Sequence, residues 1–282
     1  MTTLTDTKTR TVARLVRGLP TSDGAGVKLN RVIGTQMLPD VDPFLMLDEF
    51  RSDDPQAYIA GFPDHPHRGF ETITYMLAGR MRHKDTRGNE GLLGPGDVQW
   101  MTTARGLQHS EMPEQQDGLM QGFQLWLNLP AKEKMLEPAY KDIPAATIPV
   151  IETGGNTIKL IAGAQSGQTG PIASPTTQPY IADVVLTPNG QVSLDIPDGH
   201  AGFVYVYDGG LTVAGTAVQK TQAAVLAGEG QLVLDNGSDV TRALVVTGVP
   251  LKEPIVRHGP FVMNTVGEIH DAIRDYQKGL FN

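Results

Sequence analysis

The sequence predicts an all-β protein built from two related β-barrel domains, with a few short helices and a helix near the C-terminus. Its 282 residues suit one large domain or two ordinary ones, because domains cluster near ~100–150 residues. The chain is 40% apolar and contains 32 glycines and 20 prolines, which describes a globular protein dense in turns. Aperiodic Gly and Pro favour many short strands over long helices. We place the N-terminal domain at residues 1–145 and the C-terminal domain at residues 146–282.

Short segments that are rich in β-branched or aromatic residues and bounded by Gly, Asp or Asn are predicted to be strands. The clearest are residues 71–77 (ETITYML), 210–215 (GLTVAG) and 231–236 (QLVLDN). Residues 165–179 are rich in Gly, Ser, Thr and Pro and are predicted to form a loop. Strands are thus expected in both halves of the chain.

Two segments are predicted to be helical. Residues 131–138 (AKEKMLEP) follow Pro130, and residues 267–280 (GEIHDAIRDYQKGL) carry apolar side chains at helical spacing. These apolar side chains are Ile269, Ala272, Ile273 and Tyr276. The second helix is expected to end the C-terminal domain, from which it can pack back on the N-terminal one.

A weak internal repeat supports the two-domain prediction. Residues 63–70 read PDHPHRGF, and residues 197–203 read PDGHAGF. When the two are aligned on His67 and His200, both copies have Gly two positions later and Phe three positions later, each before a predicted strand. The repeat indicates two related β-domains.

The composition excludes several classes of protein. A net charge of −8 argues against direct binding to nucleic-acid backbones, which needs a surplus of Lys and Arg on one face. The locally basic residues 80–84 (RMRHK) are interpreted as a solvated hairpin. No window approaches the ~18 apolar residues of a membrane span, and the opening residues lack an apolar signal core. The absence of cysteine excludes thiolate nucleophiles and Cys-ligated metals, and a cytoplasmic protein is expected.

The first candidate metal-binding motif is an HPH triplet. His65 and His67 are two residues apart, so their side chains point to the same face if this segment is extended. Pro66 supports an extended conformation, because it fixes its own φ and biases His65 away from helix. If the strand continues, Glu71 lies on the same face, although Gly69 could host a bulge that re-aims it.

The second candidate motif lies about forty residues further on, in residues 94–113 (GPGDVQWMTTARGLQHSEMP). His109 and Glu111 are again two apart and share a face on a strand. Each pair alone is a weak signal, because such pairs also occur in cores and at strand ends. Together, three histidines and a carboxylate from two separated strands predict a metal site inside a small barrel. Imidazole plus carboxylate with open positions suits Fe(II), and less selectively Mn, Ni, Cu, Co or Zn.

The second copy of the repeat lacks this set of donors. Asp198 takes the place of His65, and Val204 takes the place of Glu71. Only the N-terminal domain is therefore expected to carry a metal ion.

The two motifs also resemble a known family. HPHRGFETITYMLAGRMRHKD (65–85), followed by residues 94–113, is similar to the pirins, a branch of the cupin superfamily with two jelly-roll β-barrels. Residues 42–50 (DPFLMLDEF) and residues 259–265 (GPFVMNT), with the helix that follows, resemble the family too. The resemblance covers most of the chain and implies a bicupin fold.

The resemblance implies a specific set of ligands. Pirins bind one iron in the N-terminal barrel through three histidines and a glutamate, which fall on His65, His67, His109 and Glu111. The broader cupin pattern would instead use Glu71, four residues after the HPH triplet, as the fourth ligand. We favour Glu111 on the pirin resemblance, with Glu71 on the inner face close to the ligands. The second barrel of pirins generally lacks a metal.

An activity is implied as well. Some bacterial pirins resemble quercetinases, which open the central ring of a flavonol with O2 and release carbon monoxide. Three imidazoles and one carboxylate leave up to two metal positions for a hydroxy-ketone oxygen and for dioxygen. Glu111 or Glu71 could accept the substrate hydroxyl proton. We expect a monomeric metal-dependent dioxygenase that acts on a small aromatic substrate and O2.

Two other roles remain open. Pirins also act as iron-dependent partners of transcription factors or metabolic enzymes, which would make this chain a redox-sensitive regulator with a protein partner. The acidic chain would then work through protein rather than through nucleic acid. The ion could also be structural, since four protein ligands can saturate zinc, although three histidines with one glutamate are an uncommon structural set.

Overall fold

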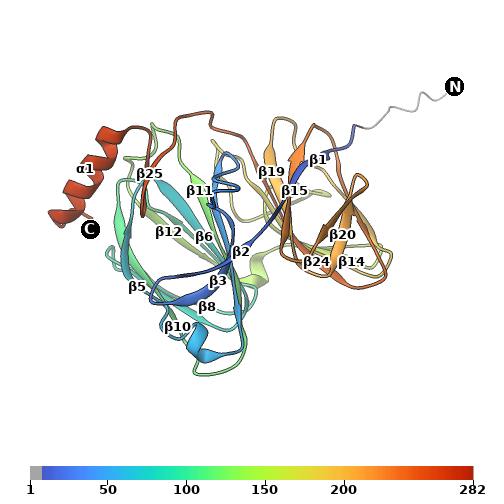
Figure 1. Cartoon of the computed structure of the whole chain (residues 1–282), viewed down its shortest axis with the longest axis horizontal. Coiled ribbons are helices and arrows are strands. Elements are labelled where there is room, and N and C mark those ends of the chain that lie inside the picture. The colour runs from blue at the N-terminus through green and yellow to red at the C-terminus, as the bar shows by residue number, and fades with distance from the viewer. Residues whose placement is uncertain (1–7, 282) are drawn as a thin grey trace. The chain divides into compact units, whose positions relative to one another are not determined.

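Antiparallel strands make up most of the computed structural model, which describes residues 8–281 (Figure 1). The prediction of an all-β, two-barrel fold is confirmed. The chain divides into two compact units, each made of two segments. The first barrel contains residues 19–147 and 251–281, and the second barrel contains residues 8–18 and 148–250. No helix within residues 8–281 is long and apolar enough to span a membrane.

The first barrel consists of two antiparallel sheets. One sheet has seven strands in the order β12-β9-β6-β11-β4-β3-β2, and the other has four in the order β5-β10-β7-β8. The elements are β2 (Leu19–Asp23), β3 (Val27–Ile33), β4 (Phe44–Ser52), the 3-10 turn η1 (Pro55–Ala57), β5 (Phe62–His67), β6 (Phe70–Ala78), β7 (Met81–Asp85), β8 (Glu90–Leu93), β9 (Val98–Thr102), β10 (Leu107–Pro113), β11 (Met120–Asn128), β12 (Ala139–Ile143) and η2 (Ala145–Thr147). The predicted strand at residues 71–77 is confirmed as β6.

The C-terminal segment completes the first barrel. It contains a two-stranded ribbon, β25 (Val256–His258) with β26 (Phe261–Met263), and the helix α1 (Val266–Gln277). Thr265 and Glu268 form a capping box at the start of α1, and Ile269 and Ala272 are buried against β26 and Phe281. The predicted C-terminal helix is confirmed, although it ends at Gln277.

The prediction of a helix at residues 131–138 is wrong. This segment forms consecutive turns, in which Glu133 and Lys134 donate backbone hydrogen bonds to the Pro130 carbonyl. Lys134 is buried at 1% exposure, although lysine is almost always exposed. Its ammonium group must find acceptors inside the protein, and this tertiary requirement overrides the local helix propensity.

The second barrel repeats the same architecture. Its seven-stranded sheet has the order β1-β22-β19-β24-β17-β14-β13, and its four-stranded sheet has the order β18-β23-β20-β21. The strands are β1 (Thr11–Arg17), β13 (Val150–Thr153), β14 (Asn156–Ala162), β15 (Ala164–Gln165), β16 (Gln168–Thr169), β17 (Tyr180–Leu186), β18 (Gln191–Leu194), β19 (Ala201–Asp208), β20 (Gly210–Val213), β21 (Thr216–Gln219), β22 (Gln222–Ala227), β23 (Leu232–Asn236) and β24 (Thr241–Gly248). The predicted strands at 210–215 and 231–236 are confirmed as β20 and β23, and residues 165–179 are mostly loop.

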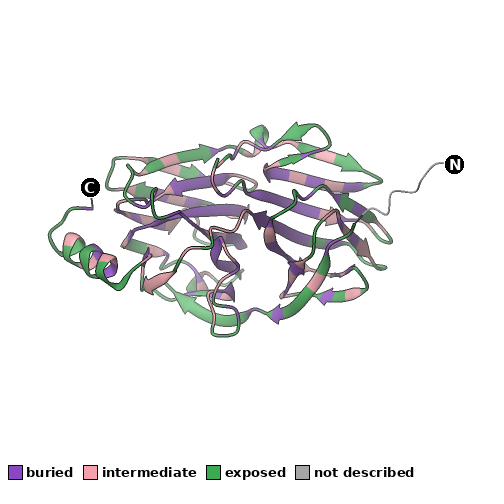
Figure 2. Cartoon of the chain, turned by 90° about the horizontal axis from the view of Figure 1, so that it is seen from above, coloured by how far each residue is buried: buried purple, intermediate pink, exposed green. Residues whose placement is uncertain are grey.

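The two barrels correspond strand for strand. β6, β9 and β11 of the first barrel match β19, β22 and β24 of the second, and the small sheets match in the same way. In both barrels the central strands of the large sheet are buried over most of their length (Figure 2). The edge of the large sheet is filled by β12 in the first barrel and by the N-terminal strand β1 in the second. The strand order therefore confirms that the two domains are related.

The residue alignment inferred from the short repeat is wrong by three positions. β6 and β19 each have a bulge near their end and are followed by a glycine with positive φ, Gly79 and Gly209. When the barrels are aligned on these features, His200 matches Phe70 rather than His67. The counterparts of the metal-binding motif must therefore be found from strand pairing.

Candidate metal centre

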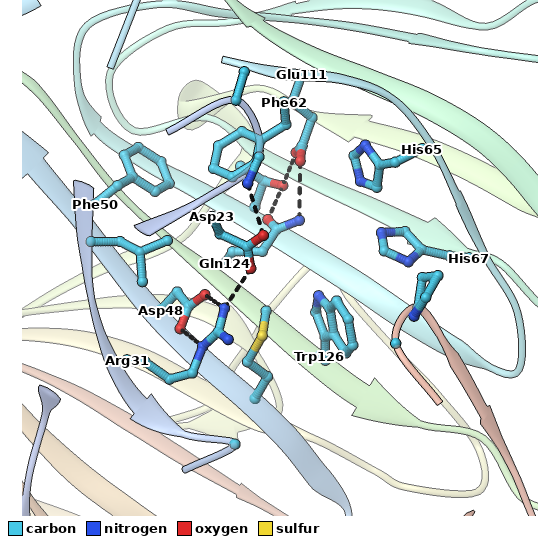
Figure 3. A pocket seen from close by; sticks show the side chains of 18 of the residues that line it. Asp23, Arg31, Asp48, Phe50, Phe62, His65, His67, Glu111, Gln124 and Trp126 are labelled. Atoms are coloured by element: carbon cyan, nitrogen blue, oxygen red, sulfur yellow. Dashed lines mark hydrogen bonds and ion pairs between the residues drawn. The ribbon is translucent and has the colours of Figure 1, made fainter. Parts of the chain in front are cut away.

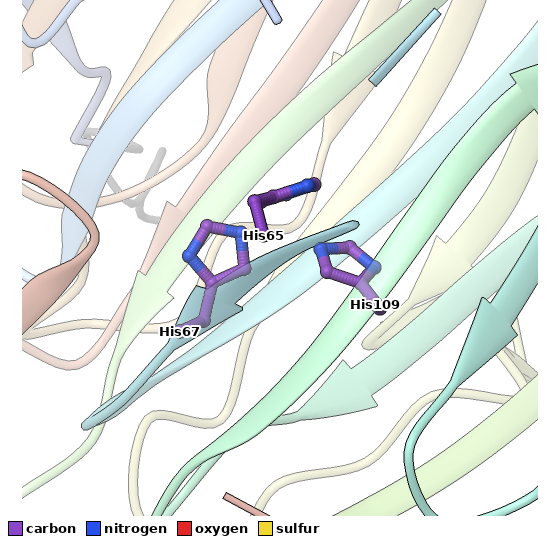
Figure 4. Close-up of side chains that lie close together, drawn as sticks. All are labelled: His65, His67 and His109. Atoms are coloured by element: carbon purple, nitrogen blue, oxygen red, sulfur yellow. The ribbon is translucent and has the colours of Figure 1, made fainter. Parts of the chain in front are cut away.

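Three histidines converge inside the first barrel (Figure 4). His65 and His67 lie on β5 and His109 lies on β10, which pairs with β5 so that His109 is opposite His65. One ring nitrogen from each histidine lies within 4.8 Å of the others. Within residues 8–281 no other group of three or more His, Asp or Glu side chains is arranged in this way. The structure thus brings together the three histidines that the sequence singles out.

Their hydrogen bonds leave nitrogen lone pairs free for a cation. The Nδ1 atom of His65 lies 2.8 Å from the Pro63 carbonyl oxygen, which can only accept, so His65 donates from Nδ1 and keeps a lone pair on Nε2. His67 Nδ1 and His109 Nε2 are buried without a hydrogen-bond partner. Buried polar atoms are rarely left unpaired. A bound metal ion would satisfy them, so these residues fit a metal.

The protonation state of the histidines also suits a metal. Burial lowers the pKa of His67, and the neighbouring His65 lowers it further. Burial likewise lowers the pKa of His109, and the neighbouring histidines lower it further because a second positive charge beside them would be repelled. Both rings are therefore neutral at pH 7, which is the form that coordinates metal ions.

Glu111 lies at the wall of a cavity that His65 and His67 also line (Figure 3). Its side chain comes from β10 and is buried, with Oε1 accepting from the Thr74 hydroxyl at 2.9 Å and Oε2 from the Gln124 amide at 3.2 Å. Glu111 does not belong to the close histidine group. Its position at the cavity suits either a fourth ligand or a proton acceptor, and its assignment as the fourth ligand stays a prediction.

Glu71 is placed differently. Gly69, with a φ of +92°, forms a sharp corner between β5 and β6, and a Cβ there would lie 2.0 Å from the Val262 carbonyl oxygen. Beyond this corner, alternation along β6 puts Glu71 on the opposite face from Thr74, whose hydroxyl contacts Glu111. Glu71 accepts from the Thr102 hydroxyl at 2.7 Å and does not line the cavity. Burial raises the pKa of Glu71 to about 7.

The cavity that Glu111 shares with His65 and His67 has a volume of about 740 Å³. Aromatic and thioether side chains form much of its wall, namely Met46, Phe50, Phe62, Met81 and Trp126. On the polar side, Arg31 donates to both oxygens of Asp48 at 2.9 and 2.7 Å and to Asp23 at 2.6 Å (Figure 3). A mainly apolar pocket of this size with a few fixed polar groups is typical of small-molecule sites.

Several residues of the site are not evident from the sequence. Thr74 and Gln124 contact Glu111 only because β6 and β11 pair in a particular register. His83 belongs to the residues interpreted as a solvated hairpin, and that interpretation is wrong for this side chain, which is fully buried. The alternation of Met81 and His83 with the more exposed Arg82 is a signal that could have placed His83 inside.

The second barrel has apolar side chains where the first has its candidate ligands. Aligned through strand pairing, the positions of His65, His109 and Glu111 are occupied by leucines. The replacing residues are Leu194, Leu232 and Leu234, and all three are fully buried in one apolar core. Leucine offers no lone pair to an ion, and these side chains instead pack into the apolar core of the second barrel.

Comparison with known proteins gives a consistent result. The family model for Pirin matches residues 26–127, and the model for the Pirin C-terminal cupin domain matches residues 181–282. A Pseudomonas aeruginosa protein named "Putative quercetin 2,3-dioxygenase" is 51% identical, over 97% of this chain and 99% of the relative. Human pirin is 41% identical, over 91% of this chain and 88% of its own length.

Solved structures agree with these matches. A quercetin 2,3-dioxygenase from Acinetobacter baumannii superposes with a TM-score of 0.90 at 33% identity and covers 98% of this chain and 99% of that one. The bacterial pirin YhhW from Escherichia coli, solved in complex with nickel(II), has the same fold, with a TM-score of 0.66 at 18% identity over 84% of this chain and 98% of that one. The chain belongs to the pirin family.

Proposed function

We propose that this chain is a metal-dependent dioxygenase of the pirin type, which opens flavonols such as quercetin with O2 and releases carbon monoxide. The observation that carries the proposal is the convergence of three buried or half-buried histidines, two of which, His65 and His67, line a 740 Å³ cavity. The names of the Pseudomonas relative and of the Acinetobacter structure point to the same substrate.

His65, His67 and His109 would hold the ion, which we propose to be Fe(II). When bound, such an ion lowers the pKa of a substrate hydroxyl and provides a route for electrons to O2. Imidazole ligands would contribute no negative charge, so a bound ion would keep a net positive charge that favours an anionic substrate oxygen. Glu111 is proposed as the fourth ligand, which would require its carboxylate to move from its present partners toward the histidines.

Glu111 also suits the proton transfer that the reaction needs. Its two oxygens receive hydrogen bonds from Thr74 and Gln124, which orient the carboxylate. A carboxylate at the cavity wall can accept the proton of a substrate hydroxyl that comes within hydrogen-bond reach. Glu71 faces away from this cavity, so Glu111 is the better candidate of the two.

The remaining cavity wall matches a flat polyphenol. Phe50, Phe62 and Trp126 offer apolar and aromatic surface for a ring system, and they exclude water from the reacting atoms. Arg31, held by Asp48 and Asp23, presents a fixed polar group to hydroxyl substituents.

The test is an aerobic assay with quercetin. We expect the Fe(II)-loaded protein to consume the flavonol, followed by its absorbance, and to release carbon monoxide. His65→Ala and His109→Ala should abolish turnover because each removes a ligand. His200→Ala is the matched control, since it removes a buried histidine from the second barrel.

The assay also separates the alternatives. If wild-type protein retains metal but shows no turnover after loading with Fe, Mn, Ni, Cu or Co, the dioxygenase proposal is overturned. In that case a metal-bound protein with a protein partner would favour the regulatory role.

A further inference from the structure

His83 contacts the candidate ligand His109. It is fully buried on β7, and its Nδ1 atom is 3.4 Å from Nδ1 of His109. One side of its ring stacks on Tyr140, with ring centroids 4.8 Å apart and an angle of 29°. Its other nitrogen, Nε2, has no hydrogen-bond partner and lies 3.6 Å from Oδ2 of Asp85.

The contact between the two Nδ1 atoms restricts how both rings carry their protons. Two imidazole nitrogens form a hydrogen bond only when one donates and the other accepts. His109 Nε2 is the buried nitrogen without a partner, and it must carry a lone pair to bind a metal. The proton of His109 must then sit on Nδ1 and point at His83. His83 accepts it at Nδ1, so its own proton sits on Nε2, on the side of Asp85.

Asp85 is fixed in a position that favours this arrangement. Its Oδ1 accepts from the backbone N–H groups of Arg87 at 2.9 Å and Asn89 at 3.0 Å, and its Oδ2 accepts from the Asn89 amide at 2.8 Å. A distance of 3.6 Å is too long for a hydrogen bond. The carboxylate therefore acts on His83 through its charge, which favours a proton on the facing Nε2 atom.

The His83 ring is also prevented from turning away. Tyr140, on which it stacks, receives a hydrogen bond from the Gln99 amide at 3.1 Å and donates one to Asp142 at 2.6 Å. Two strands, β9 and β12, thus hold the support on which His83 rests. Such outer partners fix the ring orientation and the tautomer of metal-binding histidines in many proteins.

We propose that His83 is a positioning residue of the metal centre, which holds His109 in the tautomer and orientation that present Nε2 to the ion. The inference rests on the metal site of the proposed function, but it does not depend on dioxygenase activity. If His83 only filled space, its stacking on Tyr140 would be sufficient, and no hydrogen-bond acceptor would be needed at its Nδ1 atom.

The experiment compares three substitutions that differ in where an acceptor is placed. His83→Asn keeps a carbonyl oxygen near the position of Nδ1, His83→Gln moves it toward Nε2, and His83→Leu removes it. The full chain is loaded with Co(II), its Kd is measured by competition with a chromophoric chelator, and the visible ligand-field spectrum is recorded. His200→Leu is the control for the loss of a buried histidine.

We expect His83→Leu and His83→Gln to weaken Co(II) binding by about 10- to 100-fold and to change the spectrum. His83→Asn should stay close to wild type in both. Equal Kd values and spectra for wild type and His83→Leu, or equal losses in His83→Asn and His83→Gln, would overturn the inference. If His83→Leu does not fold, the Asn and Gln pair still decides the question. A wild-type protein that binds no metal would instead refute the proposed site itself.

Discussion

Glu71 and Glu111 are both buried carboxylates of the first barrel, but their surroundings differ. Glu111 has both oxygens hydrogen-bonded, to Thr74 and Gln124, at the wall of the cavity. Glu71 accepts from Thr102 through Oε1, and its Oε2 is buried without a partner. Burial therefore penalises the charged form of Glu71, whereas Glu111 is held in place by two hydrogen-bond donors. This difference leads to two separate predictions.

The first prediction concerns metal content. Glu71→Gln should leave about one metal ion per chain, because this side chain faces away from the histidines. Glu111→Gln should weaken metal retention, while the three imidazoles still hold part of the metal. Elemental analysis of purified, reconstituted protein measures both. A loss in Glu71→Gln as severe as that in His67→Ala would show that Glu71 is the fourth ligand.

The second prediction concerns stability and pH. The folded pKa of Glu71 is about 7, above its ordinary value of 4.5. Between these values the unfolded chain binds fewer protons than the folded one, so this group lowers stability as pH rises from about 4.5 to 7. The total effect is on the order of 3 kcal/mol.

Glu71→Gln should remove this loss. Urea unfolding of wild type and variant at pH 5 and pH 8 measures it, with Glu152→Gln on an exposed strand of the second barrel as the control. An identical pH dependence in wild type and Glu71→Gln would contradict the prediction.

The candidate ligands could be predicted from sequence because each pair depends on local alternation. His65 with His67, and His109 with Glu111, share a face wherever their segment is extended. The position of Glu71 could not be settled in that way, because the corner at Gly69 depends on the approach of a backbone carbonyl from Val262, nearly two hundred residues away in sequence.

At the scale of elements, Lys134 ties together three parts of the first barrel. Its ammonium group donates to the Gly69 carbonyl at 2.6 Å, to the Asn128 side chain at 2.6 Å and to the Val262 carbonyl at 3.1 Å. These acceptors belong to the corner after β5, the end of β11 and the strand β26. The corner carries His67 at its start, so this contact also supports the metal centre.

The third prediction tests this contact. Lys134→Met keeps the apolar stem and leaves three buried acceptors without their donor, which should lower the free energy of unfolding by about 3 kcal/mol. Lys132→Met is the control, because the side chain of Lys132 is 75% exposed. Urea denaturation of both variants gives the comparison. Equal stability of the two variants would contradict the prediction and would show that water takes the place of the ammonium group.

Lys134 also explains why one helix prediction failed and the other succeeded. Residues 267–280 carry a capping box and an apolar stripe, and both are local signals that survive in α1. Residues 131–138 have good helix formers, but the burial of a single lysine decides their conformation. That burial depends on acceptors supplied by distant parts of the chain.

At the scale of the whole molecule, two barrels share one topology but differ in their interiors. The first keeps a cavity beside three clustered histidines, and the second has a core rich in leucine and valine. Sequence reasoning found the duplication and assigned the metal to the first barrel. It misaligned the repeat, because a match of a few residues does not reveal the β-bulges that set the register.

The fourth prediction follows from the filled interior. Leu234→Ala should destabilise the second barrel by about 2–5 kcal/mol through loss of packing, and it should leave metal content near one ion per chain. His200→Ala should also leave metal content unchanged. Calorimetry and elemental analysis measure the two effects. A fall of metal content to zero in either variant would show that the second barrel contributes to binding.

Strand β1 precedes the first barrel in sequence but belongs to the second barrel, and α1 follows the second barrel in sequence but belongs to the first. This connectivity constrains the order in which the two barrels can be completed during translation. Among the described strands β1 is synthesised before the others, yet its partner β22 is made some two hundred residues later. All proposed ligands of the first barrel lie before residue 112, but this barrel is complete only when β26 and α1 have also been synthesised. Nascent chains should therefore bind metal firmly only after β26 and α1 have been synthesised, however early the histidines emerge.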